Sequence, residues 1–443
     1  MNSKIRAAFL IGMTLMLAAC SAPTPTAIPE VNSPAASTPT SAPDVYNPYL
    51  PTATEVYNPY LPARTSTPAR LPTVPPPSMP NDYIVIAQLN LWFNGFGCHG
   101  GFEAFDCSGR RTTPLTPALG QVYSSANPKV IQQQIDWAYQ NGVDAFSIEW
   151  TTPREVQASL EVNIDDAFLK APNLSKIRWC IFYDFILRMD QTPSLKGINI
   201  SRGVNFDDPK VYDTFVADMV HFAKKYYGQA QYLKIDERPV IYLWSTWSWK
   251  GKYAEAVAEA RQKVKDEGYD VFIVGDVIWA NQFDPKLASQ FDGNSTFTFL
   301  LPGIDGSKWK NVQDASVDMD RAYKVWSGRV SKLTVAGRAD LVNIQPSFTP
   351  QFDNRKFDYG NPIYVPAESK EQVIAMANVA AKYAQPVGSQ NWKLIWVNTW
   401  NNWAETTTIE PTADDGPKYP AGNYQFDMLD IIREIFGTAT FGQ

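Results

Sequence analysis

Short apolar runs alternate with amphipathic segments along most of this chain. The amphipathic segments carry apolar residues at helical spacing, and Asn127–Pro128 and Asp208–Pro209 open two of them with a capping residue and a proline. The apolar runs are nearly continuous, which is typical of parallel strands covered on both faces. Helices are predicted at 127–142, 208–228, 253–268 and 368–384. Strands are predicted at 83–89, 143–149, 178–184, 239–244, 270–276, 294–300, 341–346 and 393–399.

Eight strands interleaved with helices predict an α/β fold, a (β/α)8 TIM barrel spanning residues 81–443. An open doubly wound sheet is the second possibility. It is less favoured because no glycine-rich nucleotide loop follows the first strand.

The first eighty residues differ in character. Lys4 and Arg6 precede an apolar stretch over 7–17 that is too short to span a membrane, and small residues lead to Cys20. The sequence "LAAC" resembles a bacterial lipobox, which implies a lipoprotein signal over 1–20 and lipid on Cys20. An ordinary signal peptide is the alternative. Residues 21–80 are rich in Pro, Ser, Thr and Ala and are predicted to form a disordered tether. We therefore expect a protein lipid-anchored to a bacterial membrane, at the cell surface or in the periplasm.

Composition narrows the function further. The net charge of −6 and the absence of basic runs argue against nucleic acid. His99 and His221 are the only histidines, so a histidine-rich metal site is excluded, and no cofactor is expected. Cys98 and Cys107 flank a short glycine-rich loop and are predicted to form a disulfide in an oxidising compartment. Cys180 is predicted to be a buried free thiol.

Four carboxylates fall at or beyond the C-terminal ends of predicted strands, where barrel enzymes place their chemistry. Glu149, Asp184 and Asp276 close the second, third and fifth strands, and Glu405 lies beyond the eighth. We predict that these four are the catalytic residues.

Aromatic and amide side chains gather at the same strand ends. Flat aromatic faces pack against the C–H faces of sugars, while amides and carboxylates bond hydroxyl groups, so we predict a carbohydrate site there. Glu410 either holds a sugar hydroxyl or pins its loop to the barrel, and the second role is favoured. The predicted substrate-binding residues are Trp150, Tyr183, Trp244, Trp247, Trp400, Asn401, Asn402, Trp403 and Glu410.

The C-terminal segment "NTWNNWAETTTIEP" resembles the signature of glycoside hydrolase family 99 and its relatives in the WbsX group, which runs Trp-Asn-Glu-Trp-x-Glu and then Glu-Pro. The blocks "PALGQVYSSANPKVIQQQIDWAYQNGVDAFSIEW" and "YLKIDERPVIYLW" resemble further family blocks. The resemblance implies a (β/α)8 barrel and, for the enzymes of the family, hydrolysis of internal α-mannosidic bonds by two glutamates three residues apart.

Carried onto this chain, the acid/base glutamate corresponds to Glu405 and the first glutamate to Asn402. An asparagine amide cannot take a proton at neutral pH, so that role is vacant. Glu149 also departs from the pattern, since relatives tend to carry a small residue or Trp there.

Three accounts of the site follow from this departure. In the first, Glu149, Asp184 or Asp276 acts as nucleophile or base opposite Glu405. In the second, a 2-acetamido group of the substrate supplies the nucleophile and Asn402 orients it. In the third, catalysis is lost and the site only binds glycan.

We favour an endo-acting glycoside hydrolase on a polysaccharide, α-mannan-like or a related α-glycan. The protein is expected to be a monomer whose partners are its glycan substrate and the membrane. A catalytically degenerate carbohydrate-binding lipoprotein is the alternative. A glycosyltransferase is less favoured because no nucleotide-sugar site is recognisable.

Overall fold

The computed structural model describes residues 82–93, 115–120, 123–156, 159–192, 195, 203–277, 283–297, 309–355, 363–413 and 425–441. The predicted signal over 1–20 with its lipid site at Cys20, the tether over 21–80, the Cys98–Cys107 bridge and His99 lie outside the described residues.

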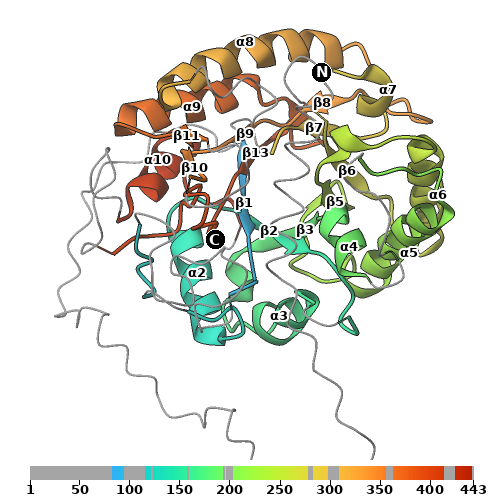
Figure 1. Ribbon diagram of the computed structural model, residues 1–443, viewed down its shortest axis with the longest axis horizontal. Coiled ribbons are helices and arrows are strands. Elements are labelled where there is room, and N and C mark those ends of the chain that lie inside the picture. Colours follow the sequence, from blue (N-terminus) through green and yellow to red (C-terminus); the bar gives the residue numbers. More distant parts are fainter. Residues whose placement is uncertain are drawn as a thin grey trace, which may run out of the picture.

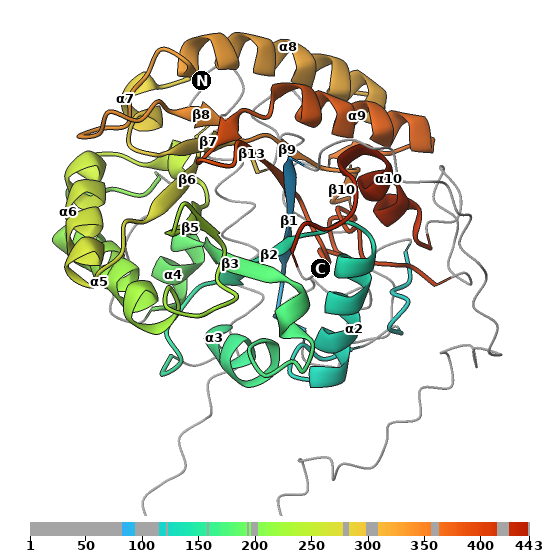
Figure 2. The same cartoon turned by 180° about the vertical axis from the view of Figure 1, so that it is seen from behind.

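A ring of parallel strands forms the centre of the fold, and helices surround it (Figures 1 and 2). The strands follow one another around the ring in chain order, from β1 through β8. β8 pairs with β7, and β9, which begins three residues after β8 ends, pairs with β13, the neighbour of β1. The two short strands together close the barrel. Its strands are β1 (Tyr83–Leu89), β2 (Ala145–Trp150), β3 (Arg178–Tyr183), β5 (Arg238–Leu243), β6 (Phe272–Asp276), β7 (Gly293–Ser295), β8 (Asn343–Ile344), β9 (Ser347–Phe348) and β13 (Trp392–Val397).

All eight predicted strands are present, and the barrel prediction is confirmed. Two of the predictions were too long. The strand expected at 294–300 ends at Ser295, because the Phe297 N–H turns to bond Asp276. The strand expected at 341–346 is split around Pro346, which has no N–H to offer a ladder. Short strands lie beside the barrel: β4 (Lys234–Ile235), β10 (Phe352–Asp353), β11 (Tyr364–Val365) and β12 (Pro386–Val387).

The four predicted helices are confirmed as α2 (Pro128–Gln140), α5 (Pro209–Lys225), α6 (Tyr253–Asp266) and α9 (Lys370–Tyr383). Side chains of Asn127 and Asp208 cap the first two, accepting from the Lys129 and Lys210 N–H groups. The prediction missed α3 (Glu161–Asn163) with the π-turn Ile164–Phe168 that continues it, α4 (Phe185–Gln191), α7 (Pro285–Ala288), α8 (Val312–Val330) and α10 (Asp427–Phe436).

Successive residues of a strand face opposite sides, and β2 shows what this does at the site. Trp150 packs outward, with its ring 4.7 Å from that of Phe222 on α5. Glu149 faces the other way, toward Asp184 and Glu405 inside the barrel mouth.

Cys180 is a buried free cysteine, as predicted, and burial raises the pKa of its thiol. Among the described residues, no helix combines the length and apolar character that crossing a membrane requires.

Candidate active site

Three of the four predicted catalytic carboxyl groups come together at the mouth of the barrel. Glu149 is the penultimate residue of β2, and Asp184 directly follows β3, the neighbouring strand. The Asp184 N–H donates to the Trp150 carbonyl at 3.1 Å, which fixes these two strand ends to each other. The Glu149 and Asp184 side chains share a hydrogen bond, and Glu149 interacts electrostatically with Glu405 of the loop after β13. The three side chains are 3%, 3% and 8% exposed.

Burial changes the protonation of this carboxyl cluster, defined as Glu149, Asp184 and Glu405. For Glu149, burial together with the charge and hydrogen bond of Asp184 and the charge of Glu405 holds the pKa well above its usual range. Burial raises the pKa of Asp184 to about 7, offset in part by N–H groups of the following helix. Burial likewise raises the pKa of Glu405 to about 7. The cluster therefore holds both protons and negative charge near neutral pH, the condition that acid–base catalysis needs.

Asn402 holds Glu405 in place. Its Nδ2 donates to Glu405 Oε2 at 2.8 Å, and its Oδ1 accepts from the Glu405 N–H at 3.2 Å. The Asn402 N–H in turn donates to Thr399 Oγ1 at 2.7 Å. Each end of the Asn402 amide is thus hydrogen-bonded to Glu405, so the structure shows this side chain holding Glu405, whereas its predicted role in substrate binding stays a prediction. Its hydrogen bond lowers the pKa of Glu405 and so opposes the effect of burial.

Asp276 does not join the carboxyl cluster. Its Oδ2 accepts from the Ser245 N–H at 3.0 Å and its Oδ1 from the Phe297 N–H at 2.9 Å. Its interactions are with these two backbone N–H groups, whereas Glu149 interacts with the carboxyl groups of Asp184 and Glu405. The predicted catalytic role of Asp276 is corrected on this geometry, because the side chain clamps two loops.

Four residues of the loop after β13 that were predicted to bind substrate are buried. Trp400, Trp403 and Asn401 are fully buried, and Glu410 is 2% exposed. Glu410 accepts from Tyr123 Oη at 2.8 Å, from Gln134 Nε2 at 2.7 Å and from Trp403 Nε1 at 3.2 Å. The favoured structural role of Glu410 agrees with these contacts. The substrate-binding predictions for Asn401 and Trp403 are corrected, because the Asn401 side chain bonds Asn90 and Tyr123 and the Trp403 Nε1 bonds Tyr123 and Glu410. Trp400 is buried with its ring 5.1 Å from that of Phe146 on β2, which makes it part of the core.

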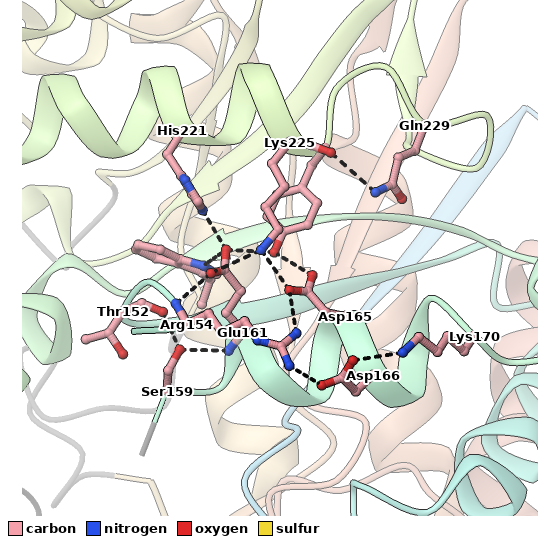
Figure 3. A network of polar contacts seen from close by, with 12 residues as sticks. Thr152, Arg154, Ser159, Glu161, Asp165, Asp166, Lys170, His221, Lys225 and Gln229 are labelled. Carbon is pink, nitrogen blue, oxygen red and sulfur yellow. Dashed lines mark hydrogen bonds and ion pairs between the residues drawn. The ribbon is translucent and has the colours of Figure 1, made fainter. Parts of the chain in front are cut away.

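Trp150 and Tyr183 are also corrected, because both face away from the mouth. Trp150 Nε1 donates to Glu161 Oε1 at 3.1 Å, and the Tyr183 hydroxyl donates to Asp218 at 2.6 Å. Figure 3 shows Glu161 inside a polar network, with His221 approaching from α5 at 2.6 Å between Nε2 and Oε1. This network ties α3 to α5 across the outer face of β2. No local signal in the sequence marks Glu161, since its partners His221, Lys225 and Tyr226 lie sixty or more residues further along the chain.

Two predicted aromatic residues are not fully buried. Trp244 and Trp247, in the turn after β5, are half-buried. The Trp244 ring lies 6.3 Å from that of Phe182, with 33° between the planes, and Phe182 is the cross-strand partner of Glu149. Trp244 therefore borders the carboxyl cluster through Phe182.

Asn90 is a candidate that the prediction missed. It directly follows β1, one step beyond the Leu89–Ile148 pair, and so stands level with Glu149 on the neighbouring strand. Its backbone N–H and carbonyl are fixed by the Asn401 side chain at 2.8 and 3.0 Å. Within the described part of the chain, the Asn90 amide nitrogen and oxygen, and Glu149 Oε2, are buried without a hydrogen-bond partner. Such groups mark a place where water or a ligand completes the bonding. Asn90 could have been found from the sequence, because it lies at the C-terminal end of a predicted strand, as Glu149 does.

Comparison with known proteins now places this geometry in context. The family model described as "Glycosyltransferase WbsX" matches residues 209–421. A solved structure titled "Glycoside hydrolase-like protein" superposes with a TM-score of 0.58 at 18% identity, covering 83% of this chain and 97% of that one. No match was found among curated proteins.

Two structures of the family 99 endo-α-mannosidase from Bacteroides thetaiotaomicron, one in complex with bis-tris propane, each give a TM-score of 0.54. Their identities are 16% and 15%, and the likeness covers 80% and 81% of this chain and 96% and 97% of theirs. The resemblance to the WbsX group and to family 99 is thus confirmed, and the chain has the fold of these glycoside hydrolases.

Proposed function

We propose that this protein is a glycoside hydrolase that cleaves internal bonds of a polysaccharide. The observation that carries the proposal is the carboxyl cluster, in which three buried acids from separate strand ends meet at the mouth of the barrel. Burying three carboxyl groups costs stability, so their retention at the habitual active face of this fold favours a chemical role.

The cluster has the two components that hydrolysis requires. One carboxylic acid must protonate the leaving oxygen, and a carboxylate must attack the anomeric carbon or activate water to do so. Glu405, with its pKa at about 7 and one oxygen held by Asn402, is assigned as the proton donor. The Glu149–Asp184 pair is hydrogen-bonded, and burial raises the pKa of both groups; this pair is assigned as the second carboxylate.

In this scheme the proton of Glu405 passes to the bridging oxygen as the bond to the anomeric carbon breaks. The hydroxyl of a water molecule ends on the anomeric carbon, and the remaining proton returns to the carboxyl groups. Asn402 fixes the orientation of Glu405 but takes no proton.

An α-mannan or a related α-glycan is the proposed substrate. The support is the fold shared with family 99 endo-α-mannosidases and the half-buried Trp244 beside the acids. Tryptophan faces of this kind suit the C–H faces of pyranose rings.

The test is hydrolysis of α-mannans, α-glucans and 2-acetamido glycans by the protein and by its Glu405→Gln and Glu149→Gln variants. We expect product release that falls by about a hundred- to ten-thousandfold in both variants. NMR of the first-formed anomer then distinguishes retention from inversion. Activity that survives Glu149→Gln on a 2-acetamido glycan alone would assign the nucleophile to the substrate instead.

A glycan-binding protein without activity is the second candidate, and Asn402 is the observation that favours it. The position that carries a glutamate in the family pattern here holds an amide committed to Glu405. Silence on every substrate, with calorimetric binding of one of them retained, would establish this function in place of hydrolysis.

We further propose that lipid on Cys20 anchors a monomeric protein to a bacterial membrane outside the cytoplasm. The support is the sequence "LAAC" behind a short apolar stretch. Labelling with radioactive palmitate in the expressing cell should mark the protein, and Cys20→Ala should abolish the label. Persistence of the label in that variant would refute the anchor.

A further inference from the structure

The turn after β5 has an unusual backbone for the residues that it carries. Ser245 lies in the left-handed region, with φ 58° and ψ 26°, which residues other than glycine adopt only at a cost. On either side of it Trp244 and Trp247 are half-buried, whereas Trp249 is buried beneath. Strain of this kind concentrates at functional sites, where the surrounding structure enforces it.

Asp276 holds this backbone by a hydrogen bond. Its Oδ2 accepts the Ser245 N–H at 3.0 Å, whereas the Ser245 hydroxyl finds no hydrogen-bond partner among the residues that the structure describes. The other oxygen of Asp276 accepts the Phe297 N–H at 2.9 Å and so fixes the residues after β7. One buried carboxylate thereby sets the position of two loops at the barrel mouth.

The two loops carry Trp244 and Phe297, which belong to one aromatic cluster. The Phe182 ring lies 4.7 Å from that of Phe297 and 6.3 Å from that of Trp244. Phe182 is also the cross-strand partner of Glu149, so this cluster adjoins the carboxyl cluster. We call the set Trp244, Phe182 and Phe297 the aromatic platform; Trp244 is its half-buried member, and Phe182 and Phe297 are buried.

We propose that Asp276 is a positioning residue, which sets the aromatic platform so that a pyranose ring of the substrate stacks on it beside the carboxyl cluster. This inference rests on the proposed function, because it assumes that the mouth of the barrel binds carbohydrate. Asp276 acts through the Ser245 and Phe297 backbones and does not touch the sugar. Its loss therefore weakens binding more than it slows the chemical step.

The chain offers a matched control in Asp144. That side chain is also buried, at 2% against 3% for Asp276, and also accepts two backbone N–H groups, those of Val85 at 2.8 Å and of Thr440. It precedes β2, at the end of the barrel opposite Glu149. Asp144→Asn therefore removes the same kind of backbone clamp at a distance from the platform.

The experiment measures binding of α-1,6-mannotriose, isomaltotriose and triacetylchitotriose by calorimetry, with kcat and KM wherever hydrolysis occurs. We expect Asp276→Asn to weaken binding and raise KM by about ten- to a hundredfold with little change in kcat, because small misplacements of binding groups have effects of this size. Asp144→Asn should lose similar thermal stability and bind like the unmodified protein.

A second substitution tests the role itself. Glycine adopts a left-handed backbone without the cost that serine carries. Ser245→Gly in the Asp276→Asn background should therefore recover much of the lost affinity, even if that background is less stable. A catalytic Asp276 could not be rescued in this way.

Three results would overturn the inference while leaving the proposed function intact. These are a loss of kcat in Asp276→Asn with binding unchanged, equal binding defects in the Asp276 and Asp144 variants, and no rescue by Ser245→Gly. Failure of the unmodified protein to bind any of the three probes would overturn the proposed function and this inference together.

Discussion

Replacing Glu405 by glutamine should abolish hydrolysis and at the same time stabilise the protein above neutral pH. Burial raises the pKa of Glu405 from 4.5 to about 7, although the side chain is held by Asn402. A folded-state pKa above the unfolded value means that ionisation opposes folding. A rise of that size corresponds to roughly 3 kcal/mol of unfolding free energy.

The sign and the pH window follow from the two pKa values. Below about pH 4.5 the carboxyl is protonated in both the folded and the unfolded state, and it exacts no penalty. The penalty grows as the pH rises toward 7 and is complete above it. Glutamine has no charge to bury and still presents an oxygen to Asn402 Nδ2. The variant should therefore match the unmodified protein at pH 4.5 and exceed its stability by up to about 3 kcal/mol at pH 8.

The assay is urea unfolding of both proteins at pH 4.5, 6 and 8, with hydrolysis measured at each pH. Glu410→Gln is the control, because burial also raises the pKa of Glu410 to about 7. Three side-chain donors point at Glu410, so an amide N–H there meets other donors, and this variant should lose stability. If Glu405→Gln were less stable than the parent at pH 8, or differed by the same amount at every pH, the reasoning would be refuted.

Three further predictions concern neighbouring groups. Glu161→Gln should cost about 3 kcal/mol of unfolding free energy at pH 7. Burial raises the pKa of Glu161, but its hydrogen bonds outweigh that effect and hold the pKa at about 2. Urea unfolding should show the difference in stability vanishing as the pH falls from 4.5 to 2, and a constant difference would contradict this. Asn402→Ala should raise the pKa of Glu405, because it removes the side chain that donates to this carboxyl group. The alkaline limb of the pH–rate profile should then shift to higher pH, and a limb that does not shift would exclude Glu405 as the acid. Tyr123→Phe should cost about 1–3 kcal/mol in urea unfolding by leaving Glu410 short of a 2.8 Å bond; unchanged stability would show that the bond is expendable.

Several features of the fold were readable because they depend on local pattern. Apolar runs between helices predicted all eight barrel strands, and capping residues such as Asn127 located helix starts. The helix α8 was readable too, since Val312, Ala315, Met319 and Tyr323 recur at helical spacing and are all buried, but the prediction overlooked it. The ends of parallel strands meet at one face, and this rule alone was enough to place Glu149 and Asp184 together.

The alternation of side chains along a strand also limits what the sequence allowed. Glu149 and Trp150 are adjacent in β2, so they cannot both face the barrel mouth, and likewise Tyr183 and Asp184 lie on opposite sides. The prediction assigned all four residues to the site because it considered only their chemical type and their place at a strand end. Applying the two-residue period would have removed Trp150 and Tyr183 from the substrate-binding set.

What the sequence determined by itself was the barrel, the face that carries the chemistry, and the spacing that pairs Asn402 with Glu405. The tertiary structure decided which acid serves which purpose. Asp276 and Glu149 both lie at strand ends, yet one clamps Ser245 and Phe297 while the other is hydrogen-bonded to Asp184. The difference arises from partners that lie between 21 and 35 residues away along the chain. A local pattern reports where a side chain points, but its pKa and its role depend on the groups that folding brings beside it.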